Sequence, residues 1–395
     1  KKTGAQIIYG PTAIAAYNIY VAKDEENFPL GNITLKLLHT PGHTTESSCI
    51  LLQDENTKAY AVFTGDTLFV GDVGRPDLAV KSNLTKEDLA AMLYDSIHAK
   101  LMPLPDDVIV YPGHGAGSAC GKNIGKETTS TIGHQRKQNY ALCCQTKDEF
   151  VAAVTSGLEE PPTYFFIDAA INKKGYDNID EVMSRNAVAL SIAQFESEML
   201  KETIVLDTRN TNTFEKGFIP GSINIGLDGQ YAVWVGSLLD HGVPILIVSD
   251  NGKEKEAILR LARVGYEHVY GYLEGGFEAW ANAGKTVDTI NSIEASMLEH
   301  SLNTRTHKII DVRNKIEWAS GVLAGAELIP LAKLERHISL LDKEVTYLIH
   351  CAGGYRSMMA ASILKKHGFK HIINVQGGIT KIKEHGFMLV IPEEV

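Results

Sequence analysis

The sequence is poor in cysteine and has no long apolar run, and both shortages limit its class. Its five cysteines are Cys49, Cys120, Cys143, Cys144 and Cys351, and none belongs to a Cys-x-x-C pair. Such sparse, unpaired usage fits a reducing cytoplasm better than a disulfide framework. No window approaches roughly 18 uninterrupted apolar residues, so we expect no membrane span.

Positive charge is also in short supply. The chain has 38 lysines and arginines against 48 aspartates and glutamates, a formal net charge of −10. This balance argues against a nucleic acid partner, although a local cation can still hold an anionic substrate. The 44% apolar and 22% charged residues are typical of a globular protein, and the length of 395 residues predicts two or three domains.

One stretch in the first half, residues 61–78, combines a strand with candidate ligands. Its apolar start predicts a short buried strand that ends at Gly65, so Asp66 follows the strand directly. A carboxylate held there can reach a metal or a substrate, and Arg75 adds a fixed cation for an anionic substrate. Taken alone, Asp66 is equally consistent with a residue that caps a turn.

Two flanking segments, residues 35–52 and 106–123, share a second pattern. Each has a strand-like apolar run, then Pro-Gly-His, then small residues. His43, Asp66 and His114 therefore each follow a predicted strand. Imidazole and carboxylate groups together suit zinc or non-haem iron, so the three residues predict a metal site, although a lone histidine is more often structural.

The motifs PGHT, GDTLF and YPGHG resemble the third, fourth and fifth motifs of the metallo-β-lactamase superfamily. The resemblance implies an αββα sandwich with a metal at one edge. The first motif of that superfamily, a Thr-His-x-His-x-Asp-His run, is not found upstream of His39, and the chain opens at Lys1 without an initiator methionine. We therefore expect an N-terminally incomplete domain whose further metal ligands precede Lys1. The alternative is a degenerate half-domain that binds no metal.

A finer resemblance, to persulfide dioxygenases, rests on GDVGRPDL, GHGAGSACGKNI and STIGHQRKQNYAL. It implies one Fe(II) held by His43, Asp66 and a second histidine from the missing motif. His114 would then lie close without necessarily binding, and Arg75 would contact the glutathione-like part of the substrate. The hydrolytic relatives, such as glyoxalase II, instead hold two metals, with Asp66 bridging them and His114 on the second. Cys120 lies near this edge, either as packing or as a thiol that meets the persulfide.

The second half contains an internal repeat. Asp207 and Asp311 lie 104 residues apart, Gly265 and Gly368 lie 103 apart, and Gly276 and Gly378 lie 102 apart. Such near-constant offsets indicate duplicated domains. Each copy alternates β-branched runs with helical patterns, which predicts a parallel sheet covered by helices.

The repeat resembles rhodanese domains, which are small α/β sulfurtransferases, in its strands ending in Asp-x-Arg and in the segments FIPGSINI and EGGFEAW. The predicted organisation is a metallo-β-lactamase-like domain at 1–183, a rhodanese-like domain at 184–287 and a second rhodanese domain at 288–395. The predicted fold class is therefore α/β, a metallo-β-lactamase αββα sandwich followed by two rhodanese-like domains.

The second copy carries the loop to which the resemblance assigns chemistry, YLIHCAGGYRSMMA. Cys351 ends a strand, Gly353 and Gly354 allow backbone N–H groups to surround a bound sulfur, and a helix begins near Arg356. These features favour anionic sulfur, so Cys351 is predicted to accept a sulfane sulfur and pass it on. Arg356 is expected to close the loop and contact thiosulfate or sulfite. The chief rival is a Cys-x5-Arg phosphatase loop, but the spacing from Cys351 to Arg356 is one residue shorter.

The first copy has no thiol in the matching loop. Aligning the strand ends places Asp250 where Cys351 stands, and Asp250, Glu254 and Glu256 make the loop acidic. An anionic persulfide would be repelled there. We therefore expect this copy to be catalytically inactive and structural.

Together the motifs predict an enzyme with two sulfur chemistries. Its first domain would oxidise glutathione persulfide or another thiol persulfide with O₂ at a mononuclear Fe(II), giving thiol and sulfite. Its last domain would transfer sulfane sulfur to or from thiosulfate through Cys351. The alternatives are a dinuclear zinc hydrolase of glyoxalase II type fused to a sulfurtransferase, and a scaffold in which only Cys351 reacts. We expect a cytoplasmic protein with neither a nucleic acid nor a membrane partner, and a homo-oligomer stays open.

Overall fold

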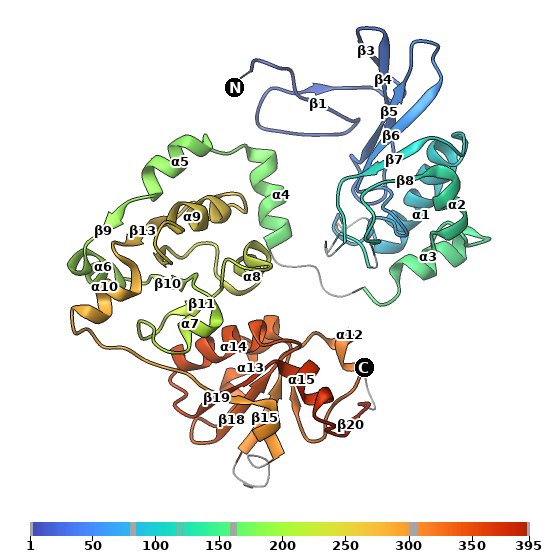
Figure 1. Cartoon of the computed structure of the whole chain (residues 1–395). Helices are drawn as coiled ribbons and strands as arrows, with labels where there is room; N and C mark the ends of the chain where they lie inside the picture. The colour runs from blue at the N-terminus through green and yellow to red at the C-terminus, as the bar shows by residue number, and fades with distance from the viewer. Residues whose placement is uncertain are drawn as a thin grey trace. The chain divides into compact units, whose positions relative to one another are not determined.

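The computed structural model describes residues 3–79, 84–116, 118, 120–122, 124–158, 164–299 and 307–392 (Figure 1). The chain forms two compact units, Lys1–Tyr176 and Asp177–Val395. The domain boundaries predicted at 183/184 and 287/288 stay predictions. Within the described ranges, no helix combines the length and the apolar sequence that crossing a membrane requires.

A six-stranded sheet organises the first unit. Its strands, in chain order and in spatial order, are β3 (Asn27–Leu30), β4 (Ile33–His39), β5 (Ser48–Gln53), β6 (Ala59–Gly65), β7 (Ile109–Pro112) and β8 (Ser130–Thr131). Neighbouring strands are antiparallel except β6 and β7, which are parallel. A separate parallel pair joins β1 (Ile8–Tyr9) to β2 (Tyr20–Val21). Because β6 and β7 run the same way, their carboxyl ends meet at one edge of the sheet.

Helices cover one face of this sheet and form the core with it. They are α1 (Lys86–Ser96), which continues as a π-helical turn at Ile97–Leu101, α2 (Ile132–Gln138) and α3 (Lys147–Thr155). Helix α4 (Tyr164–Lys174) instead accepts hydrogen bonds from Ala16 and Tyr17 of the N-terminal segment. Thr85 and Asp88 cap α1 reciprocally, which satisfies backbone N–H groups at its start. Leu93 and Phe150 pack with Val62 of the sheet in one buried apolar cluster. This packing anchors β6 against the helices.

The second unit contains two five-stranded sheets. The first sheet has the order β11 (Ile223–Asn224), β10 (Ile204–Asp207), β12 (Ile245–Val248), β13 (Val269–Leu273) and β9 (Ala189–Leu190). The other has the order β14 (Asn291–Glu294), β19 (Ile372–Gln376), β18 (Thr346–His350), β15 (His307–Asp311) and β17 (Glu327–Leu328). All neighbours in both sheets are parallel, as predicted for each copy of the repeat. A small antiparallel pair joins β16 (Val322–Leu323) to β20 (Leu389–Val390).

Short helices connect these strands. The first copy carries α5 (Ile179–Asn186), α6 (Ile192–Met199), α7 (Thr211–Phe214), α8 (Tyr231–Leu238), α9 (Glu254–Ala262) and α10 (Gly276–Asn282). The second carries α12 (Lys315–Trp318), α13 (Leu334–His337), α14 (Tyr355–Lys366) and α15 (Gly378–Glu384), with 3-10 turns at Ala295–Met297, Leu331–Lys333 and Ile338–Leu340. One buried apolar cluster includes Trp234 and Val235 from α8 together with Met358 and Ile363 from α14. The two copies therefore share a core.

The same buried ion pair recurs in both copies. Asp207 accepts hydrogen bonds from Arg209, and Asp311 accepts them from Arg313, with the Nη2–Oδ2 distance 2.6 Å in each pair. Each arginine also donates to a backbone carbonyl, that of Gly217 or of Gly321. This match supports a duplication of the whole domain.

The register of the two sheets corrects one predicted match. Asp207 pairs with Val248 across β10 and β12, and Asp311 pairs with His350 across β15 and β18. The residue that follows Val248 is Ser249, so a buried serine occupies the position of Cys351. The prediction that Asp250 stands there is wrong by one residue, because β12 ends one position earlier than the sequence alignment assumed.

Candidate functional site

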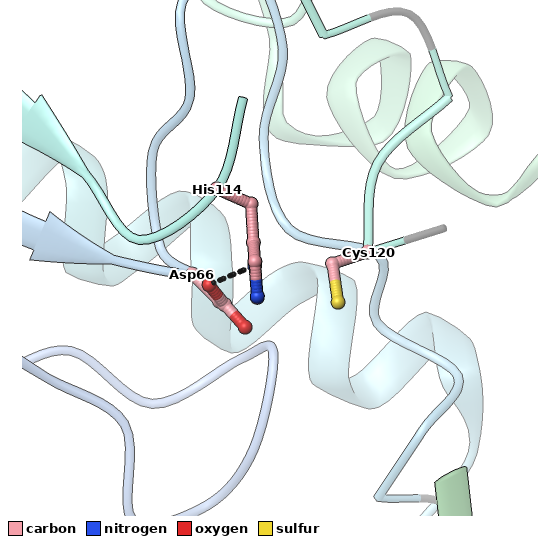
Figure 2. A group of neighbouring side chains, drawn as sticks. All are labelled: Asp66, His114 and Cys120. Atoms are coloured by element: carbon pink, nitrogen blue, oxygen red, sulfur yellow. Dashed lines mark ion pairs between the residues drawn. The ribbon is translucent and has the colours of Figure 1, made fainter. Parts of the chain in front are cut away.

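Two candidate sites lie in the chain, and the first is formed at the carboxyl ends of β6 and β7. Asp66 follows β6 directly, and His114 comes two residues after β7. Their side chains meet, with His114 Nδ1 2.9 Å from Asp66 Oδ1. Cys120 joins them from the following loop, and one ligand atom of each residue lies within 4.8 Å of the others (Figure 2). The three groups form a cluster that suits a metal ion.

His43 completes this edge from the loop after β4. It is buried, and its Nδ1 lies 2.9 Å from the backbone oxygen of Arg75, which makes Nδ1 the donor. Its Nε2 is then free of a proton and lies 3.5 Å from Asp66 Oδ2. A backbone carbonyl that fixes the tautomer of a histidine in this way is the usual support of a metal ligand.

The protonation of the three groups follows from their surroundings. Burial lowers the pKa of His43, which keeps its ring neutral. Burial alone would raise the pKa of Asp66, but hydrogen bonding to His114 outweighs it and lowers that pKa. Hydrogen bonds to Asp66 and Cys120 raise the pKa of His114 to about 10. Asp66 is therefore an anion beside a neutral His43 and a protonated His114.

Close backbone approach also supports the cluster. A Cβ atom at Gly113 would lie 2.7 Å from Asp66 Oδ1, and one at Gly74 would lie 1.9 Å from the Asp66 carbonyl oxygen. Both positions therefore need glycine. Two imidazoles, a carboxylate and a thiol held this tightly fit a metal ion of the zinc or iron type, and ligation by His114 would release its second ring proton.

Arg75 supports this edge through its backbone. Its carbonyl accepts from His43, and its N–H donates to the carbonyl of Cys120 at 3.0 Å. Its guanidinium is buried and pairs with Asp77, with Nε and Nη2 each 2.7 Å from a carboxylate oxygen. The predicted contact of Arg75 with substrate stays a prediction.

The second candidate site is the loop between β18 and α14. Cys351 follows β18 and is 1% exposed. The N–H of Gly354 donates to Cys351 Sγ at 3.1 Å, and Ser357 Oγ lies 3.6 Å from the same sulfur. Gly354 has a φ of 108°, a left-handed conformation that suits glycine, and it turns this N–H toward the sulfur. Gly353 has no atom within 4 Å of its would-be Cβ.

Arg356 lies at the start of α14 and does not stand free. Glu317 of α12 holds its guanidinium through both carboxylate oxygens, at 2.5 and 2.7 Å. Burial alone would raise the pKa of Glu317, but hydrogen bonding to Arg356 outweighs it and lowers that pKa. The expected contact of Arg356 with thiosulfate or sulfite therefore stays a prediction, made for a side chain that already has a partner.

Sequence reasoning missed three residues of these sites. Glu317, Ser357 and Asn374 surround the Cys351 loop, and Ser357 donates to Asn374 Oδ1 at 2.7 Å. Glu317 could have been found from the sequence, because Asn314 and Glu317 have the spacing of a capping box at the start of a helix. The role of Asn374 depends on strand pairing alone and leaves no local signal.

Comparison with known proteins agrees with this division of the chain. The model of the metallo-beta-lactamase superfamily matches residues 2–114, and that of the rhodanese-like domain matches residues 191–283 and 294–385. A metallo-beta-lactamase from Staphylococcus aureus is 29% identical with a TM-score of 0.59, over 69% of this chain and 77% of that one. The predicted order of a metallo-beta-lactamase domain and two rhodanese-like domains is therefore confirmed, and the first of these folds implies a metal ion.

Curated relatives match separate fractions of the chain, each about a quarter of its length. A probable hydroxyacylglutathione hydrolase of Schizosaccharomyces pombe is 38% identical over 95 residues, which are 24% of this chain and 33% of that protein. The chain thus spans about a third of the hydrolases that it matches. A sulfurtransferase of Allochromatium vinosum is 30% identical over 105 residues, which are 26% of this chain and 98% of that protein. The chain therefore belongs to the rhodanese family and carries a metallo-beta-lactamase domain ahead of its two rhodanese-like domains.

Proposed function

We propose that this protein oxidises low-molecular-weight persulfides at a mononuclear iron and transfers sulfane sulfur through Cys351. The observation that carries the proposal is the presence, on one chain, of a two-histidine and carboxylate edge and of a cysteine loop built for anionic sulfur. The names of relatives as hydroxyacylglutathione hydrolases and as a sulfurtransferase support glutathione-like and sulfane-sulfur substrates.

The first domain would convert R-S-SH, O₂ and H₂O to R-SH, sulfite and two protons. His43 and Asp66 would hold the iron, which supplies the site where O₂ and the terminal sulfur meet. The Arg75 carbonyl keeps His43 Nε2 directed at Asp66. His114 Nδ1 lies 2.9 Å from Asp66 Oδ1, so it would donate to this carboxylate and hold it in place.

The last domain would use Cys351 as a nucleophile. Its thiolate attacks the outer sulfur of thiosulfate, the S–S bond breaks, and sulfite leaves with the electron pair. The persulfide then stays on Cys351, where the N–H of Gly354 at 3.1 Å from Sγ stabilises negative charge. A low-molecular-weight thiolate can take up this sulfur to give R-S-S⁻ and regenerate Cys351, and the reverse order would form thiosulfate from sulfite.

A hydrolase of glyoxalase II type is the second candidate for the first domain. Its support is the 38% identity to a probable hydroxyacylglutathione hydrolase and the close approach of His114 to Asp66. In this case Asp66 would bridge two zinc ions, with His114 on one of them.

Metal analysis of the intact protein, purified without added metal, tests the proposal together with O₂ consumption on glutathione persulfide. About one iron per chain with persulfide-dependent uptake is the expected result. About two zinc ions per chain with no uptake would assign the first domain to hydrolysis and leave sulfur chemistry to Cys351 alone.

A further inference from the structure

A series of hydrogen bonds leads from Cys351 into the copy that has no thiol. Cys351 Sγ lies 3.6 Å from Ser357 Oγ, and Ser357 Oγ lies 2.7 Å from Asn374 Oδ1. Asn374 Nδ2 donates to Ser292 Oγ at 3.2 Å, and Ser292 Oγ donates to Glu215 Oε2. Glu215 belongs to the first copy, directly after α7, so the series crosses between the two copies.

Backbone hydrogen bonds hold three members of this series, Ser292, Asn374 and Glu215. Ser292 of β14 and Asn374 of β19 are direct partners in the parallel ladder. The carbonyl of Glu215 accepts from the N–H of Ile290 at 3.0 Å, and its second carboxylate oxygen accepts from Gln376 Nε2 at 3.3 Å. Ser357 and Asn374 are buried, so water does not compete for these bonds.

The carboxylate at the end of the series sets the direction of the bonds made by Ser292 and by the Asn374 amide. An ionised Glu215 only accepts, so the single hydroxyl proton of Ser292 goes to it. Ser292 must then accept from the Asn374 amide nitrogen, which turns Asn374 Oδ1 toward Ser357. The Ser357 hydroxyl donates its one proton either to Asn374 Oδ1 or to the Gly354 carbonyl, 3.1 Å away. In both cases Ser357 can only accept from the Cys351 thiol.

We propose that Glu215 of the first copy is a positioning residue for Cys351, because it holds Ser357 as a hydrogen-bond acceptor and so sets the pH at which the thiol becomes reactive. A bond to the protonated form favours the thiol over the thiolate. The first copy, which has Ser249 in place of the cysteine, would thus adjust the pH at which Cys351 of the second copy reacts. This inference rests on the proposed role of Cys351 in sulfur transfer.

Other charged groups lie around Cys351, and the substitutions described below leave them in place. They are Arg356 of α14, His350 of β18 and the buried pair of Asp311 and Arg313 after β15. A second contact also joins the copies, since Tyr355 Oη donates to the Gly226 carbonyl at 2.8 Å. That contact anchors the loop and does not depend on Glu215.

The test is the pH profile of the alkylation rate of Cys351 by iodoacetamide, followed by mass spectrometry of the peptide that contains it. Glu215→Leu removes the terminal acceptor, so Asn374 can turn over and Ser357 can donate to the thiolate. The profile is expected to move toward acid by roughly half to one pH unit, the size of one hydrogen bond. Ser292→Ala cuts the same series within the second copy and is expected to give the same shift, even if Glu215→Leu folds poorly.

Two further variants separate bond direction from charge. Glu215→Gln keeps an oxygen that accepts from Ser292 but loses the negative charge, so its profile is expected to stay with that of the wild type. Glu278→Leu removes an exposed carboxylate of the same copy and serves as the matched control. The proposal is overturned if Glu215→Leu and Ser292→Ala superimpose on the wild type, or if Glu215→Gln shifts as far as Glu215→Leu. Sulfur transfer that survives Cys351→Ser would instead refute the proposed function, while the alkylation profiles would still decide the role of Glu215.

Discussion

Glu317 and Arg356 form a two-point ion pair that ties the Cys351 loop to helix α12. Their side chains are 31% and 14% exposed, and the two N–O distances are 2.7 and 2.5 Å. Limited exposure reduces screening by water, so this pair contributes more than a surface ion pair would. Breaking it leaves a charged guanidinium half-buried beside the reactive loop.

We predict that Glu317→Gln destabilises the second unit in a pH-dependent way. The pKa of Glu317 is lowered in the folded chain, despite the opposing effect of burial, because Arg356 stabilises the carboxylate. A lowered folded pKa gives stability above the unfolded pKa of about 4.3, and this stability is lost as pH falls through the folded value. The free energy of unfolding should therefore drop by roughly 1 to 3 kcal/mol at pH 7, and the difference from wild type should close as the pH falls below about 4.

Urea denaturation at several pH values checks this prediction, with the exposed Glu344→Gln as the matched control. A deficit of Glu317→Gln that stays constant from neutral to acid pH would contradict it.

Two glycines near Cys351 are predicted to differ sharply in how well they tolerate substitution by alanine. Gly378 has a φ of 53°, and a Cβ there would lie 2.2 Å from the Cys351 carbonyl oxygen. Gly378→Ala should therefore cost roughly 2 to 5 kcal/mol through strain and overpacking, and it should displace the loop. Gly353→Ala meets no atom within 4 Å and should change stability by only about 0.5 kcal/mol. Thermal melting of both variants decides this, and equal losses would refute the steric argument.

The edge of the first sheet was largely predictable because it depends on strand ends. Apolar runs placed His43, Asp66 and His114 just after β4, β6 and β7, and the structure brings the three side chains together. Parallel neighbours bring distant residues to one edge whatever the loops do. The loop that adds Cys120 and the carbonyl that holds His43 depend on tertiary packing, which no local pattern records.

The duplicated sheets could equally be predicted from the sequence, but the residue-by-residue match between the two copies could not. Buried runs in both copies predicted the parallel sheets, while the match of Asp250 to Cys351 was wrong by one residue because a strand end cannot be located that closely from apolar letters. Glu317 lies 39 residues before Arg356 and Glu215 lies in the other copy, so both contacts arise only on folding.

Cys351→Ser is predicted to separate the two activities. Serine cannot carry a sulfane sulfur, so transfer from thiosulfate to cyanide should disappear. Oxygen uptake with supplied glutathione persulfide should stay at the wild-type rate, because that reaction is assigned to the first domain. The control is Cys143→Ser, which changes an exposed thiol and should leave both rates unaltered. Loss of both activities in Cys351→Ser would contradict the division of labour.

The two histidines of the metal edge are predicted to behave differently. His43 is buried, with Nδ1 bonded to a carbonyl and Nε2 directed at Asp66, so His43→Ala should lose most of its iron. His114 is bonded to Asp66 through Nδ1, and in the proposed mononuclear site it supports this carboxylate and does not hold the metal. His114→Ala should therefore keep about one iron per chain but oxidise persulfide roughly 10 to 100 times more slowly, as loss of a supporting group does at such sites.

Metal content by mass spectrometry and oxygen uptake measure both effects, with the exposed His134→Ala as the matched control. If His114→Ala instead lost one of two bound zinc ions, His114 would be a ligand of a second metal. The dinuclear hydrolase would then replace the dioxygenase as the function of the first domain.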